Sequence, residues 1–131
     1  MKDAIAYFQS KLDYLTDPAD VKAALDAHAA IVVIDARNES AYQQEHIPQA
    51  IHLHHRKMNE ESTKHLDRSL TYITYCDGIG CNASTKGALK MAQLGFKVKE
   101  LIGGISWWKR DGYAVQGTQA EETEGVTCHC D

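Results

Sequence analysis

Apolar residues near the start of the chain recur at three- and four-residue intervals, the spacing of an amphipathic helix. The first set consists of Ile5, Phe8, Leu12 and Leu15. It predicts a helix over roughly Asp3–Leu15. Asp17 is a suitable N-cap and Pro18 suits the first helical position, so a second helix should follow to about residue 29.

Short apolar runs alternate with helical stretches along the rest of the chain. Strands are predicted at Ile31–Asp35, Ala50–Leu53, Leu70–Cys76 and 96–102. Helices are predicted over 39–46, 83–94 and 105–111, and a polar stretch with weak helical periodicity covers 56–66. This alternation is typical of the α/β class, in which helices cover both faces of a mostly parallel sheet.

Length and composition indicate one domain. The chain has 131 residues, of which 44% are hydrophobic and 24% charged, which are ordinary values for a globular protein. The predicted domain covers residues 1–116, including the N-terminal helices at 3–29. Residues 117–131 are polar and acidic without a hydrophobic pattern, so we expect a flexible tail there.

Net charge and hydropathy argue against several classes of binding partner and location. The formal net charge is -4, so no general attraction for nucleic acid or anionic membranes is expected. No apolar run is long enough to cross a bilayer, and the first 15 residues lack the apolar core of a signal peptide. We therefore expect a cytoplasmic protein with reduced cysteines, which makes a structural disulfide less favoured.

The candidate chemistry lies in the stretch YCDGIGCNAS, which holds two of the 4 cysteines. This stretch could bind a metal ion, form a structural disulfide or supply a nucleophile. Cys76 ends a predicted strand, and the next helix begins a few residues later. Ligands bind at the carboxyl ends of such strands, where loop amides and a helix N-terminus favour anions. A nucleophilic Cys76 biased toward the thiolate is therefore favoured over an inert buried cysteine. Its loop comprises Asp77, Gly78, Ile79, Gly80, Cys81 and Asn82.

Over nearly its whole folded length the chain resembles the rhodanese-like (sulfurtransferase) family. The stretch IDARNESAYQQEHIPQAIHL is similar to the first family signature and supplies Asp35, Arg37, His46, Ile47, Pro48 and Ala50. The second half of the chain is similar to the remaining signature, with Cys76, Leu101, Gly103, Gly104, Trp108 and Gly112 in matching order.

The resemblance implies a single rhodanese-like domain that moves sulfane sulfur through a persulfide on Cys76, without a cofactor. The implied partners are a small sulfane-sulfur donor and a thiol or cyanide acceptor, with a sulfur-relay protein as a further option. Asp35 and Arg37 are interpreted as an ion pair that orders the loop carrying His46, a supporting role rather than a catalytic one.

The active-site loop departs from the family pattern Cys-x-x-Gly-x-Arg. Cys81 stands where the arginine is usual, and Asp77 adds a negative charge, so recruitment of thiosulfate should be weak. Arg56 either supplies the missing cation or is a solvated surface residue. Cys81 is either a resolving thiol for Cys76 or a small side chain that only fills space in the loop.

Two other functions and a metal site are alternatives to sulfur transfer. A phosphatase or arsenate reductase is disfavoured because both need a loop arginine. A catalytically weak rhodanese-fold module for binding or redox sensing is the main alternative. No metal site is predicted, because the tail run Cys128–Cys130 offers only three candidate ligands.

Overall fold

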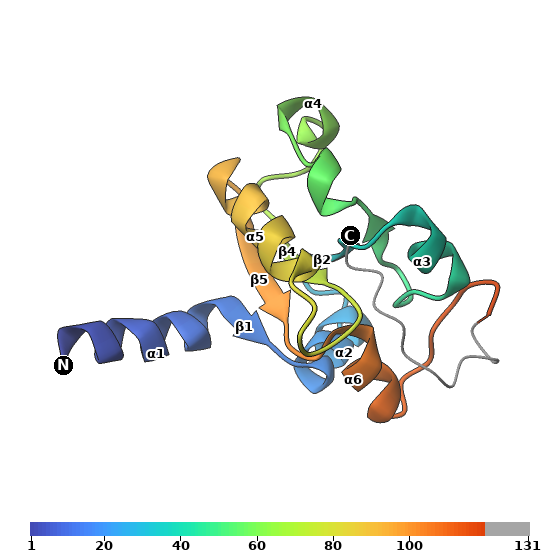
Figure 1. Cartoon of the computed structure of the whole chain (residues 1–131), viewed down its shortest axis with the longest axis horizontal. Helices are drawn as coiled ribbons and strands as arrows, with labels where there is room; N and C mark the ends of the chain where they lie inside the picture. The colour runs from blue at the N-terminus through green and yellow to red at the C-terminus, as the bar shows by residue number, and fades with distance from the viewer. Residues whose placement is uncertain (120–131) are drawn as a thin grey trace.

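A computed structural model describes residues 1–119 (Figure 1). In chain order the elements are α1 (Lys2–Tyr14), β1 (Leu15–Thr16), α2 (Pro18–Asp26), β2 (Ile31–Asp35), α3 (Glu39–Gln44), β3 (Ile51–His52), the 3₁₀ turn η1 (His55–Lys57), α4 (Glu60–Thr63), β4 (Thr71–Tyr75), α5 (Ala83–Gln93), β5 (Lys97–Leu101) and α6 (Gly104–Arg110). Every predicted strand is present. The two-residue strand β1 has too short a pattern to be predicted.

The five strands form one sheet in the order β1-β5-β4-β2-β3, and every neighbouring pair is parallel. The predicted α/β class is confirmed. β4 lies in the middle of the sheet, between β5 and β2, so the residue that follows it stands at the centre of the carboxyl edge.

Helices cover both faces of the sheet, as predicted. One apolar core joins α2 and α6 to the sheet and includes Val21, Leu25, Val33, Ile73, Tyr75, Ile105 and Trp108. The other core lies under α5 and includes Ile34, Met58, Tyr72, Met91 and Phe96. Consecutive residues of β2, Val33 and Ile34, belong to opposite cores, as the alternation of side chains along a strand requires.

Helix α1 is present as predicted, but it buries none of its residues. It projects from the domain as a separate arm, with the N-terminus at its far end (Figure 1). Ile5, Phe8 and Leu12 are 70%, 61% and 75% exposed. Leu15, the last residue of the predicted stripe, lies outside the helix and pairs with Glu100 of β5.

The segment that follows α6 forms hydrogen bonds with α3 and with the residues just after it. His46 and Gln116 form an antiparallel bridge, and the amides of Thr118 and Gln119 donate to carbonyl groups of α3, at Gln43 and Gln44. The first three residues of the stretch predicted as a tail are thus attached to the domain. Within residues 1–119 no helix is both long and apolar enough to cross a membrane.

Candidate active site

Cys76 directly follows β4 at the centre of the carboxyl edge of the sheet. The loop after it leads into α5, and the turn at Gly103 and Gly104 packs against its backbone. The amide of Ile105 donates to the Cys76 carbonyl at 3.0 Å, and the amide of Ser106 donates to the Asp77 carbonyl at 2.9 Å. The first turn of α6 therefore holds the start of the loop.

Gly104 permits this close packing. Its φ angle is 54°, and a Cβ atom there would lie 2.2 Å from the Cys76 carbonyl oxygen. No other residue fits without moving the backbone of the cysteine itself. The second glycine of the GG pair therefore serves the Cys76 loop directly.

The Cys76 side chain is 2% exposed and is a free thiol. Its Sγ atom lies 3.3 Å from the carbonyl oxygen of Cys81 and 3.4 Å from Oγ of Ser84. Both oxygens can accept a hydrogen bond from the thiol. The Ser84 hydroxyl in turn donates to Oε2 of Glu100 at 2.7 Å, which links the sulfur through a hydroxyl to a carboxylate.

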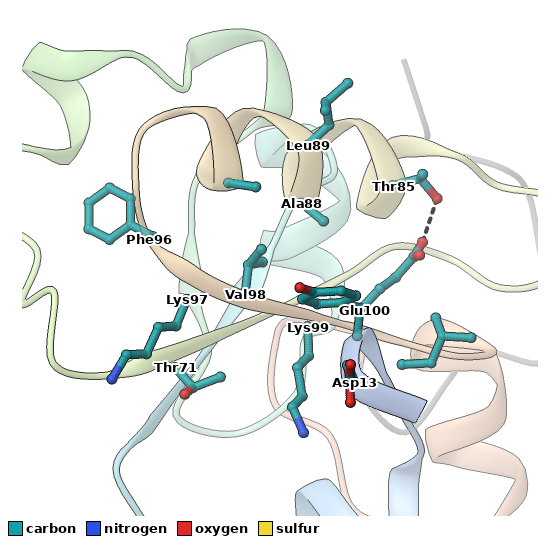
Figure 2. Close-up of a pocket in the computed structure, with 13 residues that line it drawn as sticks. Asp13, Thr71, Thr85, Ala88, Leu89, Phe96, Lys97, Val98, Lys99 and Glu100 are labelled. Atoms are coloured by element: carbon teal, nitrogen blue, oxygen red, sulfur yellow. Dashed lines mark hydrogen bonds between the residues drawn. The ribbon is translucent and has the colours of Figure 1, made fainter. Parts of the chain in front are cut away.

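Glu100 accepts a second hydroxyl, because Thr85 Oγ1 donates to the same oxygen at 2.5 Å (Figure 2). Ser84 and Thr85 lie in the first turn of α5, which Thr74 also holds by donating to the Ser84 carbonyl at 2.9 Å. The strands β4 and β5 thereby fix the start of α5 over the sulfur.

Burial raises the pKa of the Cys76 thiol above its ordinary value. Hydrogen bonds from Ser84 and from the backbone of Gly78 lower the pKa, and the charge of Asp77 raises it. The predicted bias toward the thiolate is therefore wrong for this resting state. Helix and loop amides do approach the sulfur, but desolvation has the larger effect.

A pocket of about 130 Å³ opens beside the thiol. Its lining includes Cys76, Gly78, Ile79, Gly80, Cys81, Ser84, Glu100 and Gly103. Most of the predicted loop thus borders the cavity, although Asp77 turns away from it. Among the described lining residues there is no lysine or arginine, and Glu100 carries the only charge.

Asp77 is directed to Arg37, whose guanidinium is buried at the neighbouring strand end. Arg37 Nη1 lies 2.9 Å from a carboxylate oxygen of Asp77, and Nη2 lies 2.7 Å from one of Asp35. Nη2 also donates to the Glu45 carbonyl at 2.7 Å, in the segment that carries His46. Burial lowers the pKa of Arg37, but the bonds to Asp35 and Asp77 outweigh it and hold the pKa above its ordinary value.

Tyr75 extends this cluster into the core. Its hydroxyl donates to Asp35 Oδ2 at 2.8 Å and accepts the Ile47 amide at 3.1 Å. Burial, followed by the charge of Asp35, raises the pKa of Tyr75 well above its ordinary value. Asp35, Tyr75 and Asp77 therefore belong to one buried network around Arg37.

His46 and Arg56 lie away from the sulfur. His46 stacks on Tyr42 with ring centroids 3.9 Å apart and hydrogen-bonds the Tyr42 carbonyl through Nδ1 at 2.7 Å. Arg56 is exposed on η1 and does not line the pocket that holds Cys76. Its role in anion recruitment stays a prediction.

Cys81 and Cys76 are not bonded to each other. Cys76 is a free thiol. The resolving role of Cys81 stays a prediction. The Cys128–Cys130 run lies outside the described residues, and residues 1–119 contain no cluster of three or more potential metal ligands.

Ser84 and Glu100 were missed in the sequence. A hydroxyl in the first turn of the helix that follows a nucleophile loop is a weak signal that could have pointed to Ser84. No sequence pattern pointed to Glu100, because a carboxylate on a strand of alternating polarity is usually solvent-exposed. Only the pairing of β5 with β4 brings it to the sulfur.

Comparison with known proteins places these features in a family. A family model described as "Rhodanese-like domain" matches residues 17–111. A thiosulfate sulfurtransferase GlpE of Coxiella burnetii is 40% identical over 81 residues, which cover 60% of this chain and 72% of the relative.

Solved structures agree with this match. The BH2092 protein of Bacillus halodurans superposes with a TM-score of 0.87 and 43% identity, over 94% of this chain and 90% of that protein. A thiosulfate sulfurtransferase of Pseudomonas aeruginosa, 23% identical, shares the fold alone, with a TM-score of 0.73 over 91% of this chain and 23% of its own.

Proposed function

We propose that this chain, which belongs to the rhodanese-like domain family, is a sulfurtransferase that carries sulfane sulfur as a persulfide on Cys76. The observation that carries the proposal is a free thiol at the central strand end, facing a small pocket beneath a loop of backbone amides. The likeness to a thiosulfate sulfurtransferase at 40% identity supports the same reaction class.

In the first half-reaction the Cys76 thiol gives up its proton to solvent, and the resulting thiolate attacks the sulfane sulfur of the donor. A new S–S bond forms on Cys76 while the donor's own S–S bond breaks. With thiosulfate as donor, sulfite leaves with the electron pair. Ser84 Oγ, 3.4 Å from Sγ, can turn its hydroxyl hydrogen toward the thiolate once the thiol proton has gone.

In the second half-reaction an acceptor attacks the terminal sulfur. The bond between that sulfur and Cys76 Sγ breaks, and its electron pair returns to Cys76 as a thiolate. Cyanide would leave as thiocyanate, and a thiolate acceptor would leave as a persulfide. Amides of the 77–82 loop would stabilise the negative terminal sulfur between the two steps.

The charge of the pocket favours donors with little negative charge. Glu100 is the one charged residue among the described lining residues, and Arg37 is already bonded to two carboxylates. A doubly charged anion such as thiosulfate finds no free cation there. We propose that neutral or singly charged persulfides are better donors.

The decisive test compares the wild type with Cys76→Ser on a panel of donors and acceptors. A serine cannot form a persulfide, so transfer should fall to background while the fold survives, as circular dichroism would show. Mass spectrometry of the wild type after donor treatment should show one added sulfur that cyanide removes. Cys81→Ser is the matched control. It retains Cys76, so it should gain the same added sulfur after donor treatment. Transfer by Cys76→Ser would refute the proposal.

A redox or binding module without transfer activity is the alternative that this panel also addresses. The raised pKa of Cys76 would suit a binding module, because a neutral thiol reacts slowly with sulfur donors and with oxidants. In that case no donor on the panel would leave sulfur on Cys76.

A further inference from the structure

Exposed apolar side chains concentrate in one region of the molecule. Among the described residues eight large apolar side chains are exposed. Five of them, Ile5, Tyr7, Phe8, Leu12 and Tyr14, lie on α1, and Leu89 lies on the neighbouring α5. A soluble chain rarely exposes this much apolar surface in one place without a partner for it.

Helix α1 has too few contacts of its own to be stable. It has 13 residues, none of them buried, and extends away from the domain (Figure 1). Isolated helices of about 12–15 residues are marginal in water, and tertiary packing of an apolar face supplies most of their stability. The stripe of Ile5, Phe8 and Leu12 therefore needs a surface to pack on.

Such a surface lies at the base of the same helix. A cleft of about 650 Å³ opens between the end of α1, helix α5 and strand β5 (Figure 2). Its apolar lining includes Leu15, Ala88, Leu89, Ala92, Phe96 and Val98, and Lys97, Lys99 and Glu100 also line it. Because α1 leaves the cleft at Asp13 and Tyr14, its more distal stripe cannot fold back into it without breaking the helix.

We propose that the chain forms a symmetric dimer in which the α1 arm of each copy packs its Ile5, Phe8 and Leu12 stripe into the α5–β5 cleft of the other. A convex apolar helix and a concave apolar cleft on one chain are complementary between two copies, and a two-fold axis satisfies both pairs at once. The arm also lies outside the matched rhodanese-like region, 17–111, so the domain does not require it for its own core.

The surface available suits a stable dimer. A standard interface buries about 1,200–2,000 Å² in total. Each aromatic side chain can bury about 150–250 Å², and two-fold symmetry counts each one twice. Ile5, Phe8 and Leu12 of both arms, together with the cleft residues that they would cover, reach this range.

The dimer would place the arm of one copy beside the active site of the other. The cleft shares Leu15 and Glu100 with the pocket that holds Cys76. The partner's arm would then border the approach to the sulfur on the Glu100 side. The inference concerns assembly and does not depend on the transfer activity.

The test is the mass of the full chain in solution by sedimentation equilibrium. The wild type should have twice the 14.6 kDa of one chain. The arm variant Phe8→Glu/Leu12→Glu and the cleft variant Leu89→Glu should each be monomeric. Ser10→Glu on the opposite side of α1 and Gln93→Glu on α5 outside the cleft are matched controls and should remain dimeric.

Mixing the two monomeric variants identifies the contact. The arm variant keeps an intact cleft and the cleft variant keeps an intact arm, so the mixture can form one of the two contacts. It should associate more tightly than either variant alone. A monomeric wild type, which would assign the cleft to another protein or a small ligand, would overturn the proposal. A dimer that survives Leu89→Glu would overturn it as well.

Discussion

The carboxyl ends of β2 and β4 lie side by side in the sheet, with Asp35 opposite Tyr75, yet they differ in how fully their polar groups are bonded. At the end of β2, Arg37 is bonded to two carboxylates and a backbone carbonyl at 2.7–2.9 Å. At the end of β4, the Cys76 sulfur has contacts of 3.3 and 3.4 Å and faces an open pocket.

The two strand ends on this edge of the sheet therefore have different roles: the end of β2 is structural, and the end of β4 carries the reactive sulfur. The Arg37 network leaves none of its charges available to a ligand, so it can shape the loop but cannot recruit a donor. The Cys76 side is loosely bonded, which leaves the sulfur able to form and break a bond. Asp77 connects the two sides, because it follows Cys76 and pairs with Arg37.

Removing the guanidinium should have the largest effect on stability. Arg37→Met keeps the volume but leaves Asp35 and Asp77 as buried carboxylates without their cation. We expect a loss of about 3–5 kcal/mol in the free energy of unfolding, measured by urea denaturation. Arg110→Met is the control, since Arg110 pairs with Asp111 on the surface and should change stability by about 0.5 kcal/mol or less. Equal effects of the two substitutions would show that the Arg37 cluster contributes no more than a surface pair.

Tyr75→Phe tests the edge of the same network. It removes the hydroxyl that donates to Asp35 and accepts from the Ile47 amide. The expected loss is about 1–3 kcal/mol, because two buried groups lose a partner. Tyr7→Phe, at an exposed ring, serves as the control in the same denaturation experiment. A loss as small as that of the control would mean that rearrangement replaces the missing bonds.

Ser84→Ala tests the Cys76 side. The Ser84 hydrogen bond lowers the pKa of Cys76, so its loss should raise that pKa further. The thiolate fraction grows as the pH rises, so alkylation of Cys76, followed by peptide mass spectrometry, should shift to higher pH. Thr85→Ala is the matched control, because Thr85 donates to the same carboxylate without touching the sulfur. An unshifted profile in Ser84→Ala would remove Ser84 from any role at the sulfur.

The smallest expected effect concerns donor choice. Cys81→Arg places a cation on the lining of the pocket and should lower the KM for thiosulfate about fivefold, the value of about 1 kcal/mol for one exposed charge pair. Cys81→Gln is the control, because it removes the same cysteine without adding charge. If the wild type already uses thiosulfate as well as Cys81→Arg does, a cation elsewhere, with Arg56 the first to test, recruits the donor.

Local sequence patterns were sufficient to predict the α/β class, the main helices and strands, and the position of Cys76. Runs such as Ile31–Asp35 and Thr71–Tyr75 are apolar enough to be buried on both faces, and the helices between them make the strands parallel. A residue that follows such a strand must lie at the carboxyl edge. These features depend on local patterns and chain chirality, which a sequence displays directly.

The surroundings of each of these residues depend on how the whole chain packs. Arg37 and Asp77 are 40 positions apart and Ser84 and Glu100 are 16 apart, so the sheet order had to bring them together. The pKa of Cys76 rises because desolvation by its packed surroundings outweighs the loop amides, a balance that no motif displays. In α1 the spacing shows which side is apolar, but only the path of the chain after Tyr14 leaves that side without a surface to cover it.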